Sequence, residues 1–101
     1  MRIHFERTGG FAGMRMTTTV NTESLSPEEA RDLHEMVDAA RFFELPAAIT
    51  TPTPGADRFH YKLTVETEGQ QHTVDVGEAA VPKALWPLLR QLTALARSSR
   101  A

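Results

Sequence analysis

Hydrophobic and polar side chains alternate at the start of the chain. Three apolar residues are separated by polar ones across residues 1–7, which is the period of a strand with one buried face. The pair Gly9-Gly10 follows, and residues 11–20 are rich in threonine, a β-branched residue that favours strands. The pattern therefore predicts a first β-hairpin with a tight glycine turn.

The third predicted element is a helix with a clear start. Ser26 can cap the helix, Pro27 suits the first helical position, and Glu29 stands three residues after the cap. Apolar residues then recur at helical spacing, with charged residues on the opposite side. We expect this helix to end within residues 42–45, before Pro46.

A loop and a second hairpin are expected next. Residues 47–57 are rich in proline and threonine and contain a glycine, a composition that disfavours helix and strand interiors. Strict alternation of apolar and polar residues returns over residues 59–66 and again over residues 71–76. These two strands flank a turn at residues 68–70 and form the second hairpin.

The last predicted element is a leucine-rich helix that opens at Pro82. Pro87 lacks a backbone donor and fits this helix only if the helix starts near Lys83. The element order is therefore β-β-α-β-β-α, and each helix has one apolar stripe to bury. The expected fold is α+β: a four-stranded antiparallel sheet with two helices packed on one face, in a single domain over residues 1–101.

Composition narrows the possible functions. The formal net charge is −2, which provides no polybasic surface, so neither nucleic acid nor a membrane is an expected partner. The chain has no cysteine, which excludes disulfides and thiolate chemistry. The first residues lack the apolar core of a signal peptide, and no apolar run approaches the ~18 residues of a membrane span. We therefore expect a cytoplasmic protein.

Histidines are the only plausible nitrogen ligands for a metal ion. None of the four forms the i, i+4 helical pair of a zinc site. Cross-strand pairing could still bring His60 near His72, but a third ligand is not evident. No metal site and no cofactor are expected.

The other candidate catalytic groups have plain structural roles. The glutamates at residues 28–29 belong to a helix start, and the acidic residues within 32–38 lie on a solvated helix face. The serines lie near a helix cap or the chain end, without a nucleophile-elbow motif. Residues 8–13 are glycine-rich but lack the following helix and lysine of a phosphate loop. These patterns predict a binding protein and not an enzyme.

Two loops are unusual for a domain of this size. Phe11 follows the glycine pair at the mouth of the first hairpin, where its side chain can fold inward or project outward. The loop before residue 59 ends in Asp57-Arg58, whose charges can pair with each other, cap the strand or contact a partner. A structural turn and a binding loop are both open interpretations here.

Chain direction predicts how these loops are arranged. If the first helix runs antiparallel to the second strand, the loop after it returns to the sheet end that carries the first hairpin. The two loops then become neighbours. The opposite end gathers Met1, the connection at residues 21–24 and the turn at residues 68–70, and it is the competing surface.

Four short runs of residues resemble the emfourin family, and the resemblance spans most of the chain. Members of this family are small bacterial inhibitors of protealysin-like enzymes, which are zinc metalloproteases of the thermolysin family. The runs are Gly9-Gly10-Phe11-Ala12-Gly13, Ala39-Ala40-Arg41-Phe42-Phe43, Asp57-Arg58-Phe59-His60-Tyr61 and His72-Thr73-Val74.

The resemblance implies a non-catalytic inhibitor that blocks the active-site cleft of a thermolysin-like zinc metalloprotease with two neighbouring loops. We expect the protein to be a monomer. One loop would offer an acidic side chain to the protease zinc, and the other would offer apolar side chains to substrate pockets. We assign the acidic role to Asp57, with Glu23 at the opposite end as the alternative, and the main apolar role to Phe11. The expected protease-binding residues are Gly9, Gly10, Phe11, Ala12, Met14, Pro54, Asp57 and Arg58.

Two other interpretations remain open from the sequence alone. One is an interaction or adaptor domain without inhibitory activity, which would bind through the polar face or the exposed edge of its sheet. The other is a small enzyme or ligand-binding domain, which needs a concave pocket with convergent titratable groups. No such constellation is evident in the sequence.

Overall fold

The chain folds into one sheet and two α-helices in a computed structural model that describes residues 1–9, 14–49 and 59–98. The strands are β1 (Arg2–Gly9), β2 (Met14–Asn21), β3 (Ala48–Ile49), β4 (Phe59–Glu66) and β5 (Gln71–Gly77). The helices are α1 (Pro27–Ala39) and α2 (Trp86–Ser98), and the 3₁₀ turns are η1 (Thr22–Ser24), η2 (Phe42–Glu44), η3 (Glu78–Ala80) and η4 (Lys83–Leu85). Both predicted hairpins and both predicted helices are present.

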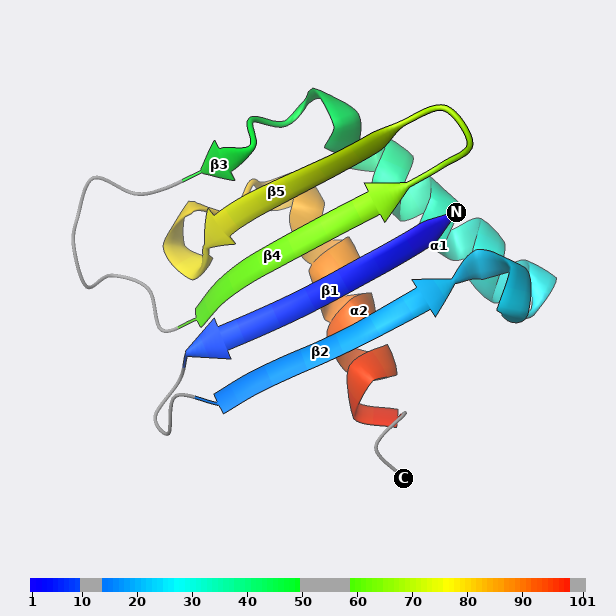
Figure 1. The fold of residues 1–101 in the computed structure, drawn as a ribbon, viewed down its shortest axis with the longest axis horizontal. Helices are drawn as coiled ribbons and strands as arrows, with labels where there is room; N and C mark the ends of the chain where they lie inside the picture. Colours follow the sequence, from blue (N-terminus) through cyan, green and yellow to red (C-terminus); the bar gives the residue numbers. More distant parts are fainter. Residues whose placement is uncertain (10–13, 50–58, 99–101) are drawn as a thin grey trace.

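The sheet has the strand order β2-β1-β4-β5-β3. Strands β1, β2, β4 and β5 pair in antiparallel fashion, whereas β3 pairs in parallel with β5. The α+β class is therefore confirmed, but the prediction of four antiparallel strands is wrong because the sheet is mixed and has five. Both helices lie behind the same face of the sheet (Figure 1).

The fifth strand replaces part of the loop expected over residues 47–57. Ala48 lies opposite Asp75 and Ile49 opposite Val76, and the amide of Asp75 donates to the carbonyl of Ala47 over 2.8 Å. A strand of two residues is too short to show a period in the sequence. Its backbone hydrogen bonds to β5, and not its side-chain pattern, define it.

The core lies between the sheet and the helices. Alternate residues of the central strands point toward the helices and are fully buried, such as Ile3, Phe5 and Leu63. They pack against the leucine stripe of α2, including Leu88 and Leu92. Each such side chain contributes about 1.5–3 kcal/mol by leaving water, so this one-sided packing is the main source of stability.

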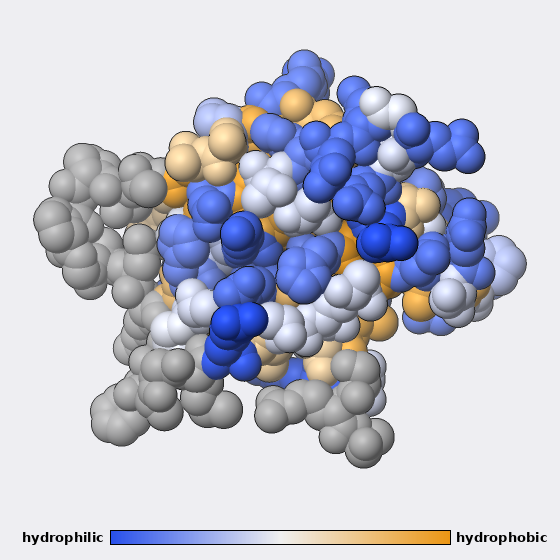
Figure 2. All heavy atoms as spheres, in the orientation of Figure 1, coloured by the Kyte–Doolittle hydropathy of each residue, from blue (hydrophilic) through white to orange (hydrophobic). Residues whose placement is uncertain are grey.

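The other face of the sheet is open and polar. Figure 2 shows this face covered mostly by hydrophilic side chains in the region that the structure describes. Across it, His4 and Thr19 form a hydrogen bond of 2.9 Å, and Arg2 and Glu66 form an ion pair of 3.7 Å. The face therefore carries exposed cross-strand pairs and no helix.

Helix α1 begins as predicted but ends earlier. The hydroxyl of Ser26 accepts a hydrogen bond from the Glu29 amide over 3.2 Å and donates to the Glu29 carboxylate over 3.0 Å. The helix stops at Ala39, because Arg41 adopts a left-handed backbone conformation with φ of 49°. The expected end within residues 42–45 is therefore wrong, and that segment is mostly the separate turn η2.

Pro87 occupies the first turn of α2, where its missing backbone donor has no helical acceptor to lose. The sequence predicted that this helix starts near Lys83. Residues 83–85 instead form the 3₁₀ turn η4, and α2 follows it from Trp86. In the described part of the chain, neither helix combines the length and the apolar character needed to cross a membrane.

The double hydrogen bond of Ser26 predicts a measurable contribution to stability. We expect Ser26→Ala to lower the free energy of unfolding by about 1 kcal/mol, because the substitution removes the N-cap of α1. Urea denaturation measures this change. Ser24→Ala is the matched control, since Ser24 is exposed in η1, and its effect should stay within about 0.5 kcal/mol. Equal losses from both substitutions would contradict the capping role.

Candidate functional site

The candidate site is the end of the sheet where β1 stops and β2 and β4 begin. Gly9 lies opposite Met14 on one side and opposite Phe59 on the other. Ile49, the last residue of β3, pairs with Val76 of β5, which in turn pairs with Tyr61 near the start of β4. The residues that bound the segments 10–13 and 50–58 are therefore gathered at one end of the sheet (Figure 1).

The chain reaches this end by a different route from the one expected. Helix α1 crosses behind the strands, and after it the carbonyl of Leu45 accepts a 2.7 Å hydrogen bond from Nε2 of His72, near the opposite sheet end. Strand β3 then leads the chain back along β5. The residues that bound the two loops are neighbours, as expected. Strand β3, and not the direction of α1, brings them together.

Most of the predicted protease-binding residues lie outside the described part of the chain. These are Gly10, Phe11, Ala12, Pro54, Asp57 and Arg58. Gly9 is described and has a φ of 102°, a conformation that side-chain-bearing residues rarely adopt. Met14 contributes its backbone to the first position of β2. The structure therefore describes the strand ends that flank the predicted site, Gly9, Met14 and Phe59, which we call its frame.

Described side chains support this frame on both faces of the sheet. On the helix face, the Arg7 guanidinium stacks over the Phe59 ring at 4.4 Å from its centroid, a cation–π contact that links β1 to β4. On the open face, Arg15 and Glu6 form an ion pair of 3.5 Å between β2 and β1. These contacts connect the strands that carry the ends of both segments.

His60 and His72 lie apart and on opposite faces of the sheet. His60 is exposed on the open face, where its Nε2 lies 3.1 Å from Oδ1 of Asp75. His72 lies on the helix face and contacts the Phe42 ring edge-on. Cross-strand pairing therefore does not bring these two histidines together, because His60 is opposite Gly77 and His72 is opposite Val65.

Tyr61 lies next to the candidate site and is buried on the helix face. Only 5% of the residue is exposed, and its ring meets the Trp86 ring edge-on with centroids 6.1 Å apart. Burial raises the pKa of the Tyr61 hydroxyl above 10, and the negative charge of Glu78 raises it further, while the charge and hydrogen bond of Arg7 act in the opposite direction. The phenol is therefore neutral at physiological pH.

The opposite end of the sheet carries Glu23, the alternative acidic residue. Glu23 is exposed in η1, and its amide donates to the Asn21 side chain over 3.0 Å. The amino group of Met1 donates to Thr22 Oγ1 over 3.1 Å, so the chain start lies at this end. Glu23 is therefore separated from the candidate site by the length of the strands, as the sequence predicted.

Sequence reasoning did not single out Arg7 or Tyr61 as site residues. The alternation of β1 could have indicated Arg7. Every second residue of this strand faces the helices, and Arg7 follows Ile3 and Phe5 in that series, so its charge lies on the helix face. A charged side chain on the buried face of a strand needs a compensating contact or a route to solvent. The aromatic neighbour of Arg7 is Phe59.

The strands thus gather the residues that bound segments 10–13 and 50–58 at one end of a helix-backed sheet, and the described residues show no recognisable catalytic centre. A family model with the description Emfourin matches residues 5–93. The chain therefore belongs to the Emfourin family, which is a family of inhibitors and not of enzymes, with proteases as partners. No curated protein and no solved structure matches the chain significantly.

The environment of Tyr61 predicts a high titration midpoint. Tyr61 is the only tyrosine, so the absorbance of tyrosinate at 295 nm reports on this residue alone. We expect a midpoint above pH 10 in the folded protein and near 10 in urea, because burial disfavours the charged phenolate. A folded midpoint at or below 10 would contradict this assignment.

The same shift predicts a loss of stability in alkali. The stabilising contribution is fully present below pH 10 and is lost as the pH rises through the folded pKa, because the unfolded chain releases the proton first. The free energy of unfolding of Tyr61→Phe should therefore decline less between pH 9.5 and 11 than that of the unmodified protein. Parallel declines would indicate that other groups account for the alkaline loss.

Proposed function

We propose that this protein inhibits thermolysin-like zinc metalloproteases by inserting two neighbouring segments, residues 10–13 and 50–58, into the active-site cleft. Membership of the Emfourin family supports a protease as the partner. The observation that carries the choice of surface is the double pairing of Gly9 with Met14 and Phe59. It brings the bounding residues of both segments to one sheet end.

The proposed mechanism assigns different chemistry to the two segments. A carboxylate oxygen is a normal zinc ligand, and Asp57 is the carboxylate in the second segment. Its binding to the protease zinc would displace the metal-bound water, which is the nucleophile of hydrolysis in such enzymes. Phe11, with weaker contributions from Ala12 and Met14, would occupy an apolar substrate pocket. Inhibition would then require no cleavage of the inhibitor.

The rest of the domain would act as a rigid support. Gly9 and Phe59 belong to central strands that are paired on both sides, and Arg7 stacks on Phe59. Holding the ends of a binding segment in place lowers the ordering cost on association and so increases affinity. This role fits a domain whose described residues show packing and pairing but no arrangement of catalytic groups.

The first test of this proposal is inhibition itself. We expect an excess of the protein to stop peptide hydrolysis by a thermolysin-like protease. Unimpaired hydrolysis would refute the proposal and would leave a protein-binding domain without inhibitory activity as the remaining interpretation. An assay with a serine protease of similar peptide specificity checks that the effect is directed at the zinc enzyme.

Two substitutions test the proposed surface. We expect Asp57→Asn, which keeps the size of the side chain and removes its charge, to raise the inhibition constant at least about 30-fold, the effect of losing a contact of ~2 kcal/mol. Phe11→Ala should act in the same direction. Glu23→Gln makes the same chemical change at the opposite sheet end and should leave inhibition intact.

Melting temperatures of these variants separate binding from folding. We expect all three to melt within a few degrees of the unmodified protein. A loss of inhibition confined to Glu23→Gln would move the site to the opposite end. A large drop in melting temperature for Phe11→Ala would assign that side chain to the core.

A further inference from the structure

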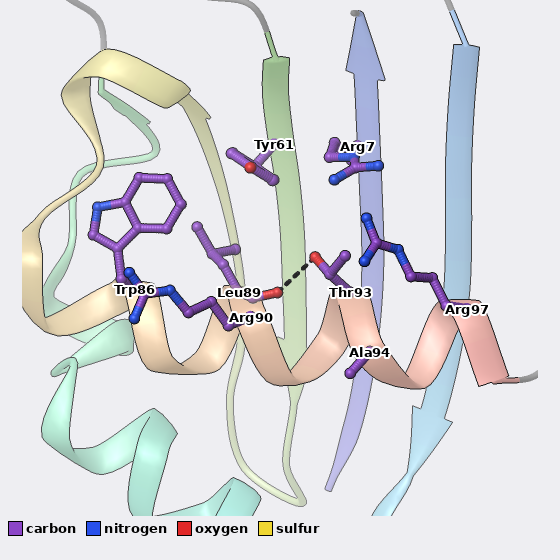
Figure 3. A pocket seen from close by; sticks show the side chains of 8 residues that line it. All are labelled: Arg7, Tyr61, Trp86, Leu89, Arg90, Thr93, Ala94 and Arg97. Atoms are coloured by element: carbon purple, nitrogen blue, oxygen red, sulfur yellow. Dashed lines mark hydrogen bonds between the residues drawn. The ribbon is translucent and has the colours of Figure 1, made fainter.

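A pocket of about 310 Å³ lies on the helix face, between α2 and the strands β1 and β4. Its polar lining consists of Arg7, Tyr61, Arg90, Thr93 and Arg97, and Trp86, Leu89 and Ala94 complete its wall (Figure 3). The volume lies at the lower end of the range of ligand sites. The pocket can therefore hold a small molecule or a single functional group.

Three guanidinium groups and no carboxylate line this pocket. Figure 3 shows Arg97 extending from α2 toward Arg7 on β1, while Arg90 lies beside Trp86. Arginine stays protonated at every physiological pH, so Arg7 and Arg97 bring like charges toward one another, and Arg90 places a third charge beside Trp86. Two arginines on the open face, Arg2 and Arg15, are instead paired with glutamates of neighbouring strands.

The contacts described for the three arginines are with aromatic rings and with the end of a helix. Arg7 stacks on Phe59 at 4.4 Å and Arg90 lies over Trp86 at 5.8 Å from the ring centroid. Arg97 lies in the last turn of α2, where positive charge is favoured by the helix dipole. The four ion pairs described in the structure join other residues: Arg2 with Glu66, Arg15 with Glu6, Arg41 with Glu44, and His60 with Asp75.

The remaining polar groups also suit a negatively charged ligand. Burial, and after it the negative charge of Glu78, raise the pKa of Tyr61, so its hydroxyl keeps its proton and can donate to an anion. The charge of Glu78 opposes an anion at this hydroxyl, so the guanidinium groups are the main donors. The hydroxyl of Thr93 already donates to the Leu89 carbonyl over 2.8 Å. The donors available to a ligand are therefore the guanidinium groups and the phenol, and guanidinium groups bind oxyanions through paired hydrogen bonds.

From this arrangement we propose that the pocket is an oxyanion-binding site for the phosphate or carboxylate group of a small organic anion. The charge of the ligand would lie between Arg7 and Arg97, and Trp86 would provide an apolar wall for its body. The proposal goes beyond protease inhibition and does not depend on it. The pocket is nevertheless close to the candidate site, since Arg7 and Tyr61 are each two residues from the strand ends Gly9 and Phe59.

The fluorescence of Trp86, the only tryptophan, provides a direct assay on the free protein. We expect a saturable change on titration with inorganic phosphate at constant ionic strength, with chloride as the replaced ion. Phenyl phosphate should bind more tightly than inorganic phosphate if Trp86 contacts the body of the ligand, and succinate tests a carboxylate source. No saturable response to any of the three anions would overturn the proposal.

Matched charge removals test the location of the site. We expect Arg97→Gln to raise the dissociation constant at least about tenfold, since it removes a charge-assisted hydrogen bond. Arg31→Gln removes the same charge from the exposed face of α1 and should leave the constant unchanged. An equal loss from Arg31→Gln would show a general effect of net charge and refute the site.

A second measurement keeps this test independent of fluorescence. Backbone amide shifts induced by phosphate in NMR spectra should cluster around Arg7, Thr93 and Arg97 in the unmodified protein. Arg97 is exposed, so Arg97→Gln should fold normally, and melting curves check this. Shift changes spread evenly over the surface, or clustered elsewhere, would contradict the assignment of the pocket.

Discussion

The antiparallel pairing of β1 with β4 is the constraint on which the other features depend. Its register places Ile3 opposite Val65 and Phe5 opposite Leu63, all four fully buried against the helices. A shift by one residue would turn this set toward solvent, so the hydrophobic packing specifies the register strongly. The same register places Arg7 opposite Tyr61 and Gly9 opposite Phe59. The core therefore determines the geometry of the candidate site and of the arginine pocket.

The two faces of the sheet differ in chemical character because the helices cover only one of them. The helices cover one face and leave the other as a polar surface of cross-strand pairs. Where the core ends, the helix face becomes a charged pocket beside the strand ends of the candidate site. The two proposed sites thus use adjacent parts of the same frame. An anion held by Arg7 would lie next to the stacked ring of Phe59, where the proposed inhibitory segment 50–58 ends.

Patterns among neighbouring residues predicted much of the fold. The features that the sequence did not predict depend on contacts between residues far apart in the chain. Alternation identified both hairpins, and the Ser26 cap identified the start of α1, because these features depend on neighbouring residues. The predicted end of α1 was wrong, because nothing in the sequence around Arg41 indicates its left-handed backbone conformation. The pocket escaped prediction because tertiary packing alone brings Arg97 toward Arg7. The assignment of Asp57 and Phe11 to protease binding remains a prediction.

The two attachments of residues 50–58 differ greatly in strength. On one side the chain leaves β3, a strand of two residues at the edge of the described sheet, where its partner is β5. On the other side it enters β4, an eight-residue strand with partners on both edges. Elements with few backbone pairs open at low free-energy cost. Detachment of β3 would therefore lengthen the chain between η2 and Phe59, while Phe59 and the packed core stay in place.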